Sequence, residues 1–370
     1  MFRGLMDHWV PTREHLSAFW RTDLDACRAL LDELLDEIAC NNFTFYTKWY
    51  TNGIKSALPY LRNHPAAANT RTDNEWGRAL LAHLHDRGLT AGAMLQCYTF
   101  ERTPWADAPQ LGEWVTDMPE IAETDGPIAM ADFTTDLYQT RLAEMLREQL
   151  SLFPDFDYFF LEFEGITPEM AELAYRRWCG RQGEQPVVEP SFSAEATAWC
   201  ARLGIECDYR FSQQALEMYR DCLARNLQTA QTVLDEVEYR GTPGVVYHPT
   251  YWEKFLAPEV LPHEGWWLLP WSYFGWVKKE DQKTHMAAML EHMAEQIARG
   301  RHVLYIGDAT IAPYSLTPME LTMDFCENSG AEGYLGMGNP IYPLGLHWRG
   351  VTEEMVRSAR EFFRRRWPVR

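Results

Sequence analysis

Two glutamates end one of the most apolar stretches of the sequence. Residues 156–167 read FDYFFLEFEGIT, so Glu162 and Glu164 follow a run of aromatic and aliphatic side chains. An ionised carboxylate buried in an apolar interior costs several kcal/mol unless it is paired or changes its protonation state. We therefore expect that basic side chains from other strands pair with these glutamates, or that a catalytic site uses them.

The spacing of the two glutamates suits acid catalysis. Residues at i and i+2 of a strand share a face, so both glutamates would lie on the side of Phe160. An enclosed apolar site raises the pKa of a carboxyl group, which allows it to act as a general acid near neutral pH. We predict catalytic roles for both glutamates, with Glu164 at the C-terminal rim of the strand and Glu162 about one layer below it.

A second carboxylate ends another apolar run. Asp308 follows the strand-like stretch in LYIGDAT, where it could act as a nucleophile or as the base for a water molecule. In the alternative reading it only caps the turn that follows. We favour the catalytic role because Asp308 would face Glu164 across the proposed fold.

Polar and aromatic residues also end the other predicted strands. Those predicted to bind substrate are Asp7, His8, Lys48, Trp49, Gln96, Tyr98, His248, Tyr251, Trp271 and Tyr273. Lys48 could form a Schiff base, but an ion pair with a glutamate is favoured because nothing else indicates carbonyl chemistry. Several of the 15 tryptophans lie near predicted strand ends. An indole offers an apolar face and an N–H donor, which suits a carbohydrate-like ligand.

A metal site is the weaker alternative for the same residues. Its ligands would come from Asp7, His8, Glu162, Glu164, His248 and Asp308. The HxH pair that metallohydrolases of barrel fold usually carry is missing from MDHW at residues 6–9. We therefore predict neither a metal nor another cofactor.

Short apolar runs alternate with amphipathic stretches along the whole chain. Strands are predicted at 2–8, 43–48, 91–98, 157–164, 244–250, 266–273, 302–308 and 331–337. The clearest helices are predicted at 22–39, 134–152, 211–235, 281–299 and 352–367. Apolar runs without strict alternation are typical of parallel strands that are covered on both sides.

This count of strands predicts an α/β fold, a closed (β/α)₈ TIM barrel with long loops after the third and fourth strands. A doubly wound open sheet is the alternative, which is disfavoured because no GxGxxG or GxxxxGK[ST] turn follows a strand. Residues 1–370 are predicted to form one barrel domain, with a helical loop insertion around 165–210. Loops that follow barrel strands build the active-site face, so the extra chain would cover a substrate.

The amino-acid composition argues against two classes of binding partner, nucleic acids and anionic membranes. The net charge of −19 and the pI near 5.0 oppose binding to nucleic acid or to an anionic membrane surface. The eight cysteines form no CxxC pair, so we expect reduced thiols that are mostly buried. No stretch is apolar for long enough to cross a membrane. We expect a soluble cytoplasmic protein with a small-molecule or oligosaccharide substrate; a homo-oligomer remains an open alternative.

Two stretches resemble known glycosidases. FRGLMDHW at residues 2–9, followed by a helix and NNFTFYTKW at 41–49, resembles the first β–α–β unit of the family 20 glycoside hydrolases, the β-N-acetylhexosaminidases. The stretch from 130 to 165 resembles one found in related glycosidase-like barrels: a D-F-T start, a helix, a P-D-x-D turn and a strand that ends in an acid. The family's Asp-Glu dipeptide on the fourth strand is replaced by Glu162-Phe163-Glu164.

The resemblance implies a glycoside hydrolase that cleaves a glycosidic bond at the C-terminal face of a barrel. By position, it also implies Glu164 as the general acid, with Glu162 orienting it or binding substrate. Two other classes stay open, a non-catalytic carbohydrate-binding barrel and a metal-dependent barrel hydrolase or isomerase. Chelation should separate the metal enzyme from the glycosidase, and Glu164→Gln should leave binding by a non-catalytic barrel unchanged.

Overall fold

The structure of the protein is a computed structural model. It describes residues 1–8, 24–49, 52, 53, 58, 74–97, 99–101, 110–114, 128–163, 168–186, 192–207, 212–247, 258–272, 282–307, 317–337 and 353–369.

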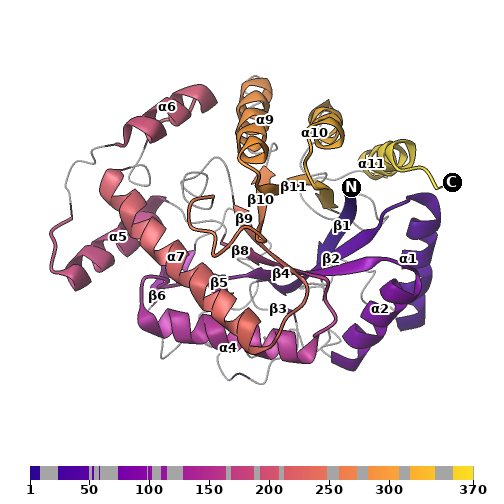
Figure 1. Ribbon diagram of the computed structural model, residues 1–370, viewed down its shortest axis with the longest axis horizontal. Helices are drawn as coiled ribbons and strands as arrows, with labels where there is room; N and C mark the ends of the chain where they lie inside the picture. The colour runs from indigo at the N-terminus through magenta and orange to yellow at the C-terminus, as the bar shows by residue number, and fades with distance from the viewer. Residues whose placement is uncertain are drawn as a thin grey trace.

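Eight parallel strands close into a barrel at the centre of the molecule (Figure 1). In chain order they are β1 (Phe2–His8), β2 (Asn42–Trp49), β4 (Thr90–Gln96), β8 (Tyr158–Glu162), β9 (Thr242–Tyr247), β10 (Trp267–Ser272), β11 (His302–Gly307) and β12 (Gly333–Met337). Each pairs with its neighbours along the chain, and β1 pairs with both β2 and β12. The closed barrel that the sequence predicts is confirmed, and the open sheet is wrong.

Helices surround the barrel and return the chain between strands (Figure 1). They are α1 (Leu24–Glu37), α2 (Asn74–Asp86), α4 (Asp136–Leu152), α7 (Gln213–Glu236), α9 (Gln282–Ala298), α10 (Thr317–Asn328) and α11 (Glu353–Arg366). In α1 the predicted apolar face is confirmed where its side chains are described, because Leu31, Leu34 and Leu35 are buried. Helix α4 packs along α7.

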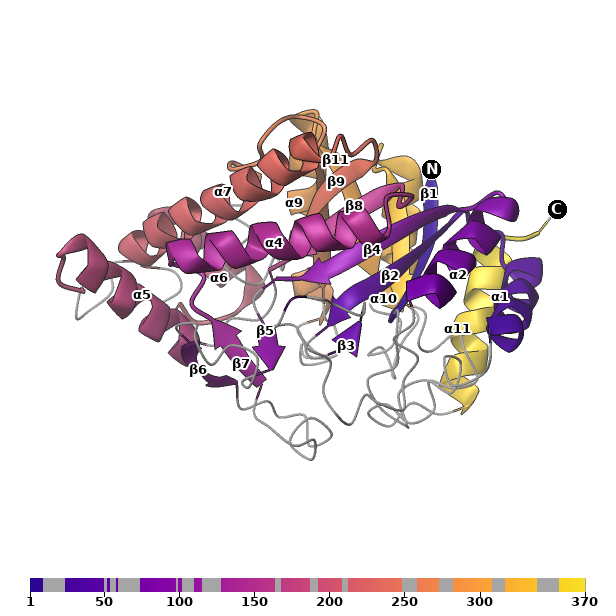
Figure 2. The ribbon, with the colours of Figure 1, turned by 90° about the horizontal axis from the view of Figure 1, so that it is seen from below.

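Smaller elements extend from one side of the barrel (Figure 2). Strands β5 (Thr99–Glu101), β6 (Gln110–Trp114) and β7 (Ile128–Ala131) form an antiparallel sheet of their own. Helix α5 (Pro168–Gln182) lies against β6, and α6 (Ala194–Leu203) packs against α9. The two-residue strand β3 (Asn52–Gly53) pairs antiparallel with β2.

The larger hydrophobic layer lies between the strands and the helices. Alternate strand residues such as Phe43, Phe45 and Leu161 face this layer and meet the buried sides of the helices. Helix α9 also buries two histidines there, His285 and His292, each 2% exposed. Burial lowers the pKa of His285 from its ordinary 6.5 to about 4.

A second hydrophobic cluster fills the barrel lumen. Its members are Phe2, Met6, Met94, Phe160, Val246, Leu269, Trp271, Leu304, Ile306 and Leu335. At the amino end of the strands, the rings of Phe2, Tyr158 and Trp267 close the lumen. The Tyr158 ring centroid lies 5.2 Å from each of the other two. The amino end of the barrel is therefore plugged by aromatic side chains.

The barrel closes where β1 meets β12. Phe2 is in register with Gly333, whose φ of +153° is a conformation that favours glycine. A Cβ at position 333 would overlap the carbonyl oxygen of Phe2. Helix α11 reinforces this seam from outside, because Arg360 forms ion pairs with Glu33 at 3.0 Å and with Glu37 at 2.6 Å on α1.

The predicted strands all occur, and their described ends differ by at most three residues from the predicted ones. Of the described thiols, Cys97, Cys179, Cys200, Cys222 and Cys326 are buried, and none forms a disulfide. Among the described residues, no helix is both long and apolar enough to cross a membrane. The assignment of the whole chain to one domain remains a prediction.

Candidate functional site

Parallel strands bring their carboxyl ends to one end of the barrel, where enzymes of this fold bind their substrates. Most of the predicted site residues lie at or just beyond these ends. For Asp7 and His8 in β1, and for Lys48 and Trp49 in β2, the backbone is described without the side chains. Tyr98, Glu164, His248, Tyr251, Tyr273 and Asp308 lie outside the described residues. The structure describes the side chains of three predicted site residues: Gln96, Glu162 and Trp271.

Gln96 and Glu162 are neighbours at the carboxyl ends of β4 and β8. The two residues are in register across the parallel strand pair, and both are fully buried. They follow Met94 and Phe160 by two residues, which are members of the lumen cluster. Strand alternation therefore turns the amide and the carboxylate to the lumen side, as predicted for Glu162 from its spacing to Phe160.

Trp271 occupies the lumen on the opposite half of the strand order. It is 1% exposed and belongs to the same cluster as Met94 and Phe160. It is in register with Ile306, two residues before the position of Asp308. An indole thus lines the same lumen that receives the amide of Gln96 and the carboxylate of Glu162.

Hydrogen bonds to β8 and to α4 hold the residue that follows β4, Cys97, in place. The backbone N–H of Cys97 donates to the carbonyl oxygen of Glu162 at 2.9 Å, and the hydroxyl of Tyr138 donates to the carbonyl oxygen of Cys97 at 3.0 Å. Burial, together with the nearby charge of Glu162, raises the pKa of the Cys97 thiol well above 9.0. Cys97 is therefore a protonated structural side chain rather than a thiolate nucleophile.

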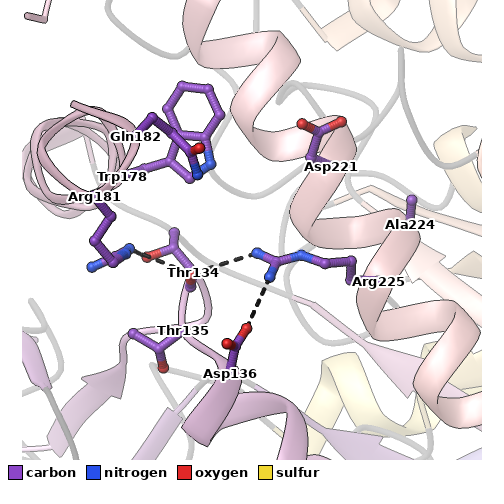
Figure 3. A pocket seen from close by; sticks show the side chains of 9 residues that line it. All are labelled: Thr134, Thr135, Asp136, Trp178, Arg181, Gln182, Asp221, Ala224 and Arg225. Atoms are coloured by element: carbon purple, nitrogen blue, oxygen red, sulfur yellow. Dashed lines mark hydrogen bonds and ion pairs between the residues drawn. The ribbon is translucent and has the colours of Figure 1, made fainter. Parts of the chain in front are cut away.

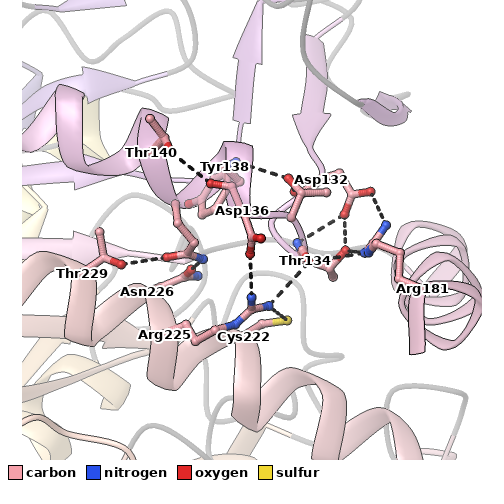
Figure 4. Close-up of polar contacts among 12 residues, drawn as sticks. Asp132, Thr134, Asp136, Tyr138, Thr140, Arg181, Cys222, Arg225, Asn226 and Thr229 are labelled. Carbon is pink, nitrogen blue, oxygen red and sulfur yellow. Dashed lines mark hydrogen bonds and ion pairs between the residues drawn. The ribbon is translucent and has the colours of Figure 1, made fainter. Parts of the chain in front are cut away.

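The D-F-T stretch anchors the start of α4 (Figure 4). The buried carboxylate of Asp132 accepts hydrogen bonds from the backbone N–H of Thr134 at 3.2 Å and from the Thr134 hydroxyl. Thr135 is the N-cap of α4, because its hydroxyl oxygen accepts from the N–H of Tyr138 at 3.2 Å. The sequence indicates this helix start, because Thr134 and Thr135 come shortly after Asp132 and both residue types favour N-caps.

Asp132 also ties α4 to α5. Arg181 and Arg177 of α5 approach its carboxylate at 3.4 Å and 3.7 Å, and Arg181 also donates to the hydroxyl of Thr134. Sequence reasoning missed both arginines, since their distance along the chain from Asp132 gives no periodic signal. These contacts hold α5 against the residues that begin α4.

The described side chains show no metal centre. Among them, no three His, Cys, Asp or Glu residues gather in a group that could hold an ion. The alternative metal set needs Glu164, His248 and Asp308, which are outside the described residues. It stays untested.

Three solved structures that match the fold of this chain carry the names of glycosidases. The PgaB glycoside hydrolase domain from Bordetella bronchiseptica matches with a TM-score of 0.54 and 13% identity, over 95% of this chain and 99% of that one. A β-N-acetylhexosaminidase matches with a TM-score of 0.55 and 11% identity, over 98% of this chain and 75% of that one. A variant of the exo-β-N-acetylglucosaminidase from Vibrio harveyi matches with a TM-score of 0.51 and 12% identity, over 99% of this chain and 56% of that one.

The chain therefore shares the (β/α)₈ barrel fold of these enzymes. No protein-family model and no curated protein matches the sequence.

Proposed function

We propose that this protein is a glycoside hydrolase that cleaves a glycosidic bond by carboxylate catalysis at the carboxyl end of its barrel. One observation carries the proposal: the buried carboxylate of Glu162 and the buried amide of Gln96 stand side by side at the carboxyl end of a lumen that is filled mainly by apolar side chains and that Trp271 also lines. A charged group in such a place is costly, and enzymes use that cost to tune acids and bases.

In the proposed mechanism, Glu164 protonates the leaving oxygen. Glu162 precedes it by two residues, and its position on the lumen side supports the same side for Glu164 if the strand continues. Asp308 acts as nucleophile or as base for a water molecule. A carboxyl separation of about 5 Å would give retention of configuration, and about 6.5–9.5 Å would give inversion.

Substrate binding is assigned to the remaining residues at the strand ends. Gln96 can both donate to and accept from a sugar hydroxyl, and the indole of Trp271 can cover the apolar face of a ring. The other proposed binding residues are Asp7, His8, Lys48, Trp49, Tyr98, His248, Tyr251 and Tyr273. The ligand class is a neutral sugar or oligosaccharide, which agrees with the acidic charge of the protein.

The test is hydrolysis of a panel of aryl glycosides and oligosaccharides, with and without EDTA. Since two of the fold neighbours are named as enzymes that act on N-acetylhexosamine units, an aryl N-acetylglucosaminide goes first. We expect Glu164→Gln to lower kcat about 100-fold or more, the usual range for loss of a general acid. Glu172→Gln on α5 is the matched control and should keep full activity, because the contact of Glu172 in the described part of the chain is an ion pair with Arg176.

The other outcomes each exclude the proposal in a different way. Activity that EDTA abolishes would identify a metal-dependent enzyme. Equal activity of wild type and Glu164→Gln would remove Glu164 as the acid. Binding of a sugar without any hydrolysis would favour a non-catalytic carbohydrate-binding barrel.

A further inference from the structure

We propose that a cavity between α4, α5 and α7 is a second binding site, which takes one neutral sugar unit of an oligosaccharide or polysaccharide. The inference rests on the proposed function in one respect, because it assumes that the ligands of this protein are carbohydrates. The site is separate from Glu162 and from the lumen residues.

The cavity measures about 570 Å³ and is built from three segments (Figure 3). Its walls are Thr134, Thr135 and Asp136 at the start of α4, Trp178, Arg181 and Gln182 on α5, and Asp221, Ala224 and Arg225 on α7. Cavities that hold small ligands usually measure about 300–1000 Å³. A sugar ring is well within the size of this one.

The α5 wall offers an aromatic platform with a polar neighbour. Trp178 is half-buried and packs against the outer hydrophobic layer, which holds its ring in place. Figure 3 shows Gln182 next to the indole, one helical turn further along α5. An apolar ring face with amide groups beside it is the arrangement that pairs with the C–H face and the hydroxyls of a sugar.

The lining also holds two arginines, Arg225 on α7 and Arg181 on α5, which contacts within the protein orient. Arg225 approaches the carboxylate of Asp136 at 3.4 Å and donates to the carbonyl oxygen of Thr134 at 3.5 Å. Arg181 is held by Thr134 and Asp132. Because these contacts orient the two guanidinium groups, the arginines lose less side-chain entropy when they bind a hydroxyl.

The charge of the lining favours a neutral ligand. Two arginines, Arg181 and Arg225, are matched by two aspartates, Asp136 and Asp221. Within the described part of the chain, the carboxylate of Asp221 and the amide of Gln182 have no side-chain hydrogen-bond partner. They can therefore bind hydroxyl groups, whereas the aspartates would repel a phosphate or a sulfate.

The cavity lies at the same end of the barrel as the proposed active site. Helix α4 runs into β8 through residues 153–157, so its first turn is at the end where the strands finish. Helix α5 is the first helix described after β8. A glycan bound at the strand ends and a unit held near Trp178 thus approach the protein from the same side.

The test is affinity electrophoresis in native gels that contain hydroxyethylcellulose, pullulan or glycol chitin, all neutral and soluble. We expect at least one polymer to retard the wild type. Trp178→Ala and Asp221→Ala should each weaken that binding about tenfold, the scale of one lost aromatic contact or one charged hydrogen bond. Glu217→Ala, one turn earlier on α7 and outside the cavity, should bind like the wild type.

Hydrolysis of a short aryl glycoside distinguishes this proposal from the proposed function. Both cavity variants should keep the wild-type KM for it, since the cavity is separate from the lumen. Retardation that survives in both variants, or no retardation of the wild type by any polymer, would overturn the cavity proposal. Loss of the retardation when inorganic phosphate is added would also overturn the proposal, because it would indicate an anion site. If binding depends on Trp178 while no glycoside is hydrolysed, the proposed function fails and the cavity proposal stands.

Discussion

Replacing His285 with glutamine should remove a specific part of the pH dependence of stability. His285 is buried on α9, and its pKa lies at about 4, below the ordinary 6.5, because burial disfavours its charged form. As the pH falls, the unfolded chain takes up the proton before the folded protein does. The stability that comes from keeping His285 neutral is therefore complete above about pH 6.5 and is lost as the pH falls to about 4.

The size of the loss follows from the two pKa values. The difference of about 2.5 between them corresponds to about 3 kcal/mol when the full range is crossed. Most of this loss of stability occurs at pH values near the pI, where the solubility of the protein is poor. Between about pH 7.5 and 5.5 the same linkage gives a loss of about 1.3 kcal/mol.

The assay is urea unfolding followed by tryptophan fluorescence at these two pH values. Carboxylates contribute to the pH dependence of both proteins, so the wild type is compared with His285→Gln. The wild type should lose about 1.3 kcal/mol more than the variant. His263→Gln, at an exposed site, controls for removal of a histidine. Equal losses in wild type and His285→Gln would refute the reasoning, since burial would then not separate the two pKa values.

Three further substitutions test contacts in the fold by urea unfolding. Asp132→Ala should lower the free energy of unfolding by about 2 kcal/mol, less than a fully buried ion pair because its arginine partners are partly exposed. Tyr247→Phe should cost about 1–2 kcal/mol, since it removes the buried 2.8 Å hydrogen bond to His292. Gly333→Ala should cost about 3 kcal/mol or more, or give insoluble protein, because the new methyl group overlaps the backbone of Phe2.

Two controls make these results specific. Gly180→Ala on α5 adds a methyl group where nothing lies within 4 Å and should not destabilise the protein. Asp155→Ala removes an exposed carboxylate. A Gly333→Ala protein as stable as Gly180→Ala would contradict the tight approach of β12 to β1. An Asp132→Ala protein as stable as Asp155→Ala would contradict the anchoring role of the D-F-T stretch.

The barrel could be predicted from the sequence because its strands are buried on both sides. Runs such as YFFLE at 158–162 and HVLYIG at 302–307 have no strict alternation and are short. The position of Glu162 on the lumen side was also predictable, since it depends only on the two-residue repeat from Phe160. Local chain properties determine both features.

The sheet of β5–β7 and the cavity could not be predicted in the same way. Strand β5 is three residues long, and 26 residues separate Glu101 from its partner Ile128 along the chain, so the pairing leaves no periodic trace. The cavity depends on Trp178, Arg181 and Arg225 from α5 and α7 meeting the start of α4. Such groups come together only through tertiary packing, which composition and spacing do not record.

The seam between β1 and β12 has a consequence for synthesis of the protein on the ribosome. Arg360 and Glu37, which pair across that seam, are 323 positions apart along the chain. Strand β1 is therefore made early and keeps one unpaired edge until β12 has been translated, while β11 exposes the other edge. The nascent chain should need protection at these two strand edges. Rapid release of the chain from the ribosome after β12 emerges should favour closure of the barrel over pairing of the edges with other chains.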